Sequence, residues 1–145
     1  MKILSKHFGE IEIEEEHIIT FERGIIGFEE YKRYVFIEFE KDSFVYWMQS
    51  IENSDLCFLV ANPYVFKPDY VLDVYEDDLK YIDMEREEDL MVFVILNVNL
   101  EEQRITANLL GPIVVNTKNN KGIQAVSKIN DYPTDYDITS KIEVS

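Results

Sequence analysis

The chain has 145 residues, with 29 acidic residues against 14 basic ones and a formal net charge of −15. This length suits one domain that buries roughly 70% of its unfolded surface, and the single cysteine, Cys57, excludes an internal disulfide. The sequence has no apolar stretch near the ~20 residues of a membrane-spanning helix, and its first residues do not resemble a signal peptide. These features predict one cytoplasmic domain over residues 1–145 that is not bound to a membrane.

The acidic excess is uneven along the chain, because residues 41–100 contain thirteen acids and only four bases. Proteins bind the phosphates of nucleic acids through clustered Lys and Arg, so this surface should repel free DNA or RNA. It would attract a basic protein partner, although an acidic surface can also serve solubility alone.

Short runs of apolar, β-branched and aromatic residues recur along the chain, and turn residues separate them. Such runs are typical of β-strands, and they predict about nine. The expected strands are residues 10–13, 35–39, 44–51, 56–61, 91–98, 105–110, 113–116 and 123–126, and a short terminal strand after a loop at 132–137. Residues 91–98 have a continuous apolar character, which indicates a buried central strand.

Helix is expected only in residues 28–34 and 76–82, and early acids in the second segment suit the helix dipole. Gly24 and Gly27 predict turns with positive φ, and either Asn120 or Gly122 can take the left-handed position of a hairpin. Many short strands with little helix predict an all-β fold that is mainly antiparallel. We expect a small closed or nearly closed β-barrel with one or two short helices, because closure removes exposed strand edges.

Tyr46 and Trp47 are neighbours in the expected strand 44–51. Successive side chains alternate across a strand, so one of the two must face the core and the other must face away. We expect Trp47 to be the core residue.

The sequence has no pattern that indicates an active site. His7 and His17 lie far apart beside acidic segments and are expected at the surface, while Cys57 is expected to be a small buried residue. Residues 14–16 and 85–89 are acid-rich, but consecutive acids in a strand or turn should not converge on an ion. We therefore expect no metal, no cofactor and no enzymatic activity.

Residues 62–70 form a proline- and aromatic-rich segment. Its two prolines, Pro63 and Pro68, fix φ and remove backbone donors, so it cannot be a central strand. Its three aromatic side chains, Tyr64, Phe66 and Tyr70, can fold inward to cap the barrel. The alternative is that they form a rigid platform for a protein partner, because a stiff loop loses little entropy on binding.

Several separated segments carry distinctive motifs. They are "FGEIEI" and "IITFERGIIGFEEYKRYVFIE", then "YWMQSIENSDLCFLVANPYVFKPDY", and finally "ITANLLGPIVVNTKNNKGIQAV" followed by "YPT". In this order and spacing they resemble the flagellar assembly factor FliW family over most of the chain. One departure is that Glu22 and Ile26 stand where the family usually has prolines, which should loosen that turn.

The resemblance implies a non-catalytic cytoplasmic protein with two competing protein partners. One is newly made flagellin. The other is CsrA, an RNA-binding dimer that represses flagellin translation. When flagellin is secreted, the freed factor would capture CsrA and relieve that repression, without binding nucleic acid itself.

The resemblance also suggests which residues contact each partner. For flagellin, the matching "NP-x-x-F" positions and one neighbour are expected: Asn62, Pro63, Phe66 and, beside them, Tyr64. For CsrA, acidic and apolar residues near an exposed turn are expected: Asn99, Leu100 and Glu101. The chain is expected to act as a monomer.

Two other classes of protein fit some of the same features. A single-stranded nucleic-acid-binding β-barrel would stack bases on aromatic side chains, although the net charge disfavours it. A carboxylate-based hydrolase would need two acids that face one cleft, which sequence cannot show.

Overall fold

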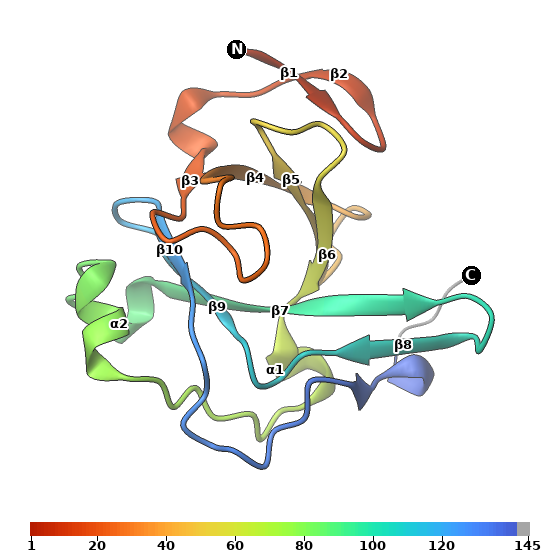
Figure 1. Ribbon diagram of the computed structural model, residues 1–145, viewed down its shortest axis with the longest axis vertical. Coiled ribbons are helices and arrows are strands. Elements are labelled where there is room, and N and C mark those ends of the chain that lie inside the picture. Colours follow the sequence, from red (N-terminus) through yellow and green to blue (C-terminus); the bar gives the residue numbers. More distant parts are fainter. Residues whose placement is uncertain (142–145) are drawn as a thin grey trace.

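The computed structural model describes residues 1–141 and contains eleven strands and two short α-helices in that range (Figure 1). The strands are β1 (Lys2–Ser5), β2 (Gly9–Glu12), β3 (Ile19–Thr20), β4 (Arg33–Glu38), β5 (Val45–Ser50), β6 (Cys57–Ala61), β7 (Leu90–Asn99), β8 (Arg104–Ala107), β9 (Ile113–Asn116), β10 (Lys121–Gln124) and β11 (Tyr136–Asp137). The helices are α1 (Pro63–Phe66) and α2 (Glu76–Tyr81), and 3₁₀ turns lie at Glu15–His17, Glu87–Asp89 and Thr139–Lys141. Within residues 1–141, no helix is both long and apolar enough to cross a membrane.

Seven strands close into a ring. Their hydrogen-bonded order is β7-β6-β5-β4-β3-β10-β9, and β9 pairs again with β7. The pairings are antiparallel except that of β10 with β3. The predicted fold class is confirmed: the protein is all-β, mainly antiparallel and barrel-like, with two short helices.

Strand β7 belongs to two parts of the fold. Its first residues, from Leu90 to Phe93, pair with β9, and its last, from Leu96 to Asn99, pair with β8. The β7–β8 hairpin therefore extends beyond the ring, with β11 along the outer edge of β8 (Figure 1). A strand rises ~3.3 Å per residue, so the two ends of β7 lie about 30 Å apart.

Several local predictions are wrong. Residues 28–34 do not form a helix, because the chain reverses through Gly27 (φ 89°) and Tyr34 is fully buried in β4. Strand β1 was not predicted, since its four residues show alternation too briefly; it forms a hairpin with β2. The expected strand 105–110 ends at Ala107, because Asn108 Oδ1 accepts the N–H groups of Leu110 and Gly111.

Two further strands differ from their expected positions. Strand β10 begins at Lys121, two residues earlier than predicted, because the tight turn at Asn120 pairs Lys121 directly with Asn116. Strand β11 occupies the end of the expected C-terminal loop, where its two residues pair with β8. The expected terminal strand is instead a 3₁₀ turn at Thr139–Lys141, and its remaining residues, 142–145, lie outside the described part.

The expected core position of Trp47 is also wrong. Tyr46 packs against the first core cluster, which contains the fully buried Met48 two residues further along β5. Because side chains alternate, Trp47 lies on the opposite face, where it stacks on the exposed His7 at 3.9 Å. The β1–β2 hairpin thus covers part of the outer face of the barrel, and Lys6 N–H donates to Gln49 Oε1 there.

The turns between strands show how glycine and asparagine fix the ring. Gly24 and Gly27 have the predicted positive φ, and Asn120 (φ 55°) takes the left-handed position of the β9–β10 hairpin. The Ile26 N–H donates to Gln124 Oε1 at 2.9 Å, a bond that a proline at this position could not make. This bond ties the turn to β10 and offsets the loosening expected from the missing proline.

Candidate partner-binding site

The proline- and aromatic-rich segment begins with one turn of α-helix, where the sequence indicated only a rigid loop. Asn62 caps the turn, because its Oδ1 accepts the Tyr64 N–H at 3.0 Å, and Pro63 suits the first helical position. The Lys67 N–H donates to the Pro63 carbonyl at 2.8 Å and closes the turn. The local sequence therefore fixes where α1 begins.

Phe66 and Tyr70 face inward and belong to a core cluster that also contains Val94, Leu96 and Leu109. Phe66 is 2% exposed and packs near Phe44 and Tyr136. Tyr70 is 4% exposed; its hydroxyl donates to the Leu109 carbonyl at 2.8 Å, and burial strongly raises its pKa. For these two residues the capping alternative holds.

The expectation that Phe66 and Pro63 contact a partner directly is not supported by their positions. Both side chains are buried in the described structure, Phe66 in the core and Pro63 at the start of α1. Their contribution to any partner site is to hold α1 in place. In contrast, Tyr64 is 39% exposed and Asn62 is half-buried, so this side of the turn is open to solvent and the platform stays a prediction for it.

Tyr64 and Asn62 lie on the wall of a groove of about 600 Å³. The groove is formed by the loop before β5, the first residues of β7, and the region around α2. Its apolar lining comes from residues far apart in sequence: Phe44, Tyr46, Leu72, Leu79, Met84 and Met91. Two acids, Asp42 and Glu87, also line it, so the groove has an apolar lining with carboxylates at its edge.

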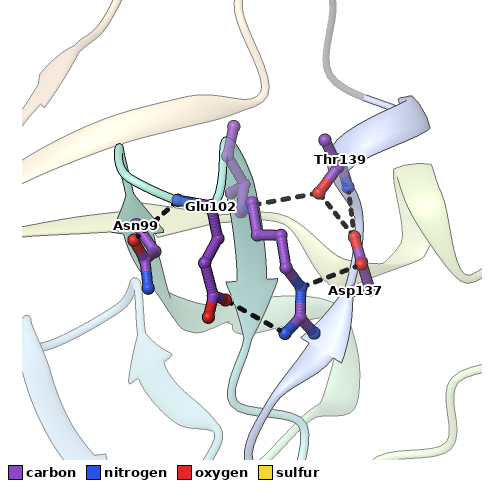
Figure 2. Close-up of polar contacts among 6 residues, drawn as sticks. Asn99, Glu102, Asp137 and Thr139 are labelled. Carbon is purple, nitrogen blue, oxygen red and sulfur yellow. Dashed lines mark hydrogen bonds and ion pairs between the residues drawn. The ribbon is translucent and has the colours of Figure 1, made fainter.

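The second expected contact region is the tip of the β7–β8 hairpin. Leu100 is 83% exposed, and Asn99 and Glu101 are exposed on either side of it. Asn99 Oδ1 accepts the Glu102 N–H at 3.1 Å, which closes the turn together with Gln103 at φ 52° (Figure 2). The exposed turn that was expected is present.

Polar contacts from β11 and the following turn hold this hairpin. Arg104 lies between two carboxylates, with Nε 3.3 Å from Asp137 Oδ2 and Nη1 3.5 Å from Glu102 Oε2 (Figure 2). Thr139 donates its backbone N–H to Asp137 at 2.9 Å, accepts the Ile105 N–H at 3.0 Å, and lowers the pKa of the Asp137 carboxyl through its hydroxyl. These contacts hold in place the hairpin that exposes Leu100 to solvent.

Neither Cys57 nor the acidic turn at residues 14–17 lies in the groove or at the tip of the β7–β8 hairpin. Cys57 is half-buried, and burial raises the pKa of its thiol to about 11, so it is not an activated nucleophile. The expectation that the residue 14–16 acids diverge is wrong for two of them. The ligand atoms of Glu14, Glu16 and His17 lie within 4.8 Å of one another, because the 3₁₀ turn brings them to one side. All three side chains are exposed.

Comparisons with known proteins identify the family. The sequence model described as "FliW protein" matches residues 2–138. The chain belongs to the FliW family. It is 40% identical over 144 residues to the flagellar assembly factor FliW of Alkaliphilus metalliredigens, covering 99% of this chain and 89% of that protein.

Other relatives agree with this assignment. The flagellar assembly factor FliW of Treponema denticola is 38% identical over 145 residues, covering 100% of this chain and 98% of that protein. A crystal structure of the flagellar assembly factor FliW superimposes with a TM-score of 0.87 at 34% identity, covering 95% of this chain and 96% of that one. The fold and the family therefore agree over nearly the whole chain.

Proposed function

We propose that this protein is a cytoplasmic flagellar assembly factor that acts by binding other polypeptides and catalyses no reaction. It binds flagellin, and when free of flagellin it binds CsrA and so relieves repression of flagellin synthesis. Family membership supports the role in flagellar assembly. The observation that carries a binding role is the preformed apolar groove beside Tyr64, which a rigid barrel presents to the solvent.

We assign the two partners to different regions. Flagellin contacts the exposed side of α1, through Asn62 and Tyr64, and CsrA contacts the hairpin tip at Asn99, Leu100 and Glu101. The segment α1 follows Ala61, which pairs with Val94 in the middle of β7, so about 20 Å of strand separates α1 from the hairpin tip. A standard interface buries about 800 Å² on each partner, a patch roughly 30 Å across, so bound flagellin can reach far enough to compete with CsrA.

A competition experiment tests this proposal. Fluorescently labelled CsrA is bound to the protein and titrated with unlabelled flagellin, and displacement is expected. Tyr64→Ala should weaken flagellin binding by about 2 kcal/mol, because exposed aromatic residues at interfaces are common anchors. Leu100→Ser should weaken CsrA binding while leaving flagellin binding unchanged.

Salt dependence provides a second measurement. The association rate with CsrA should fall as ionic strength rises, because an acidic surface attracts a basic partner through charges that salt screens. Failure of the purified protein to bind either polypeptide would refute the proposal. Turnover of a substrate, or tight binding of single-stranded RNA at physiological salt, would also contradict it.

A further inference from the structure

The negative charge of this protein is concentrated beside its apolar groove. The residues that line the groove include Asp42 from one segment and Leu79, Met84 and Glu87 from another. Those segments, residues 38–42 and 76–89, contain eleven acids and three bases. They therefore supply a net charge of −8, more than half of the chain's −15, from 19 residues.

Few of these acids are neutralised by neighbouring bases. Asp78 pairs with Arg23 at 3.1 Å and Asp83 with Lys121 at 2.6 Å, and Arg86 pairs within its own segment with Glu88. Glu87 and Asp42, which line the groove itself, are exposed and have no ion-pair partner among residues 1–141. The groove therefore offers apolar contacts in its lining and, in the described part of the chain, unpaired carboxylates at its edge, which suit an apolar ligand with cationic groups along its sides.

The groove is already formed in the described structure. Part of the groove lining is continuous with the barrel core, because four groove residues pack against the buried cluster of Ile82, Val114 and Ile123. They are Leu72, Leu79, Met84 and Leu90. A groove of about 600 Å³ holds several large side chains of a partner, as in the grooves that accept amphipathic helices. Little reorganisation would oppose binding.

We infer that the groove is a docking site for an amphipathic segment of another polypeptide, with apolar side chains in the groove and Lys or Arg along its flanks. The inference rests on the proposed function and deepens it, because it states which partner chemistry the surface beside Tyr64 accepts. The apolar contacts contribute affinity, and the carboxylates of residues 38–42 and 76–89 select basic segments over acidic ones.

Model peptides test this chemistry directly. We would use labelled helical peptides of about 18 residues, or five turns, in three forms. One has a leucine face flanked by lysines, one has the same face flanked by glutamates, and one has the lysine composition scrambled to destroy the face. Fluorescence anisotropy should show binding of the first peptide, and binding of the other two should be at least about tenfold weaker.

Two substitutions on one strand provide a matched pair. Met91 and Val98 both lie on β7 and are both 44% exposed, but only Met91 lines this groove. Met91→Glu should weaken binding of the leucine–lysine peptide at least about tenfold, and Val98→Glu should change it by less than about twofold. Met91→Glu adds a negative charge, so a purely electrostatic association would become tighter instead. Circular dichroism confirms that each variant is folded.

The charged rim has its own variant. Glu87→Lys should weaken binding of the leucine–lysine peptide and strengthen binding of the leucine–glutamate peptide. Glu15 is an exposed acid in a different turn, so Glu15→Lys should change the affinity for either peptide by less than about twofold. Equal binding of all three peptides would overturn the inference. So would a concentration-dependent dimer in sedimentation that Met91→Glu abolishes, because the groove would then hold a second copy of this chain.

The same variants separate this inference from the proposed function. If the peptides do not bind while flagellin and CsrA do, the groove inference fails and the proposed function stands. If the leucine–lysine peptide binds as expected while neither flagellin nor CsrA does, the proposed function fails and the groove chemistry stands.

Discussion

Phe66 stabilises the barrel, and its truncation should therefore affect folding before it affects binding. The side chain is 2% exposed, and its ring centroid lies 6.5 Å from that of Phe44 and 6.4 Å from that of Tyr136. Phe66→Ala removes this ring and leaves a cavity that a closed barrel cannot readily collapse. We expect a loss of about 4 kcal/mol in the free energy of unfolding.

That loss should be visible as a large change in melting temperature. For 145 residues, an unfolding entropy of about 2.1 cal/mol/K per residue gives about 0.3 kcal/mol/K, so Tm should fall by about 13 °C. Urea unfolding followed by tryptophan fluorescence measures the free energy, and circular dichroism measures Tm. Tyr64→Ala is the matched control: its side chain is 39% exposed, and we expect a loss of about 1 kcal/mol or less.

The two variants should also separate in binding. At a temperature where both are folded, Tyr64→Ala should lose affinity for flagellin, and Phe66→Ala should lose less, because Phe66 acts only by holding α1. The reasoning would be refuted by a Phe66→Ala protein with an unfolding free energy within about 1 kcal/mol of the native value and no affinity for flagellin.

Three other predictions concern single positions. Gly24→Ala should destabilise the protein by more than about 1 kcal/mol, since φ is 68° and a Cβ would lie 2.5 Å from Glu29 Cα; Gly27→Ala, with open space around it, should cost less in urea unfolding. The Cys57 thiol, with its pKa raised to about 11, should react with iodoacetamide at pH 8 far more slowly than free cysteine, and unfolding in urea should abolish that difference. The Glu52 carboxylate accepts the N–H groups of Lys32 and Arg33, which lowers its pKa below 4.5. The stabilisation from this carboxylate is present above pH 4.5 and is lost as pH falls through the lowered pKa of Glu52. The difference in unfolding free energy between the native protein and Glu52→Gln should therefore disappear below pH 4.5, and a difference that does not change with pH would contradict this.

Local signals in the sequence were sufficient for the barrel and for most of its strands. Strand β9 lies where the charge-free run 113–116 predicted it, and α2 lies where early acids indicated a helix start. Residues 28–34 misled because their composition suits a helix, whereas Gly27 and the partners of Tyr34 in the ring require a turn and then a strand. Long-range pairing decided that segment, and such pairing leaves no local signal.

The candidate site divides in the same way. The sequence alone determined the Asn62–Pro63 cap, the exposure of Leu100 and the acidity of residues 76–89, because each depends on neighbouring residues or on composition. Only the tertiary structure decided that Phe66 points inward while Tyr64 points outward. It also decided that Phe44, Leu79 and Met91, distant along the chain, line one groove, because closing the ring of strands is what brings them together.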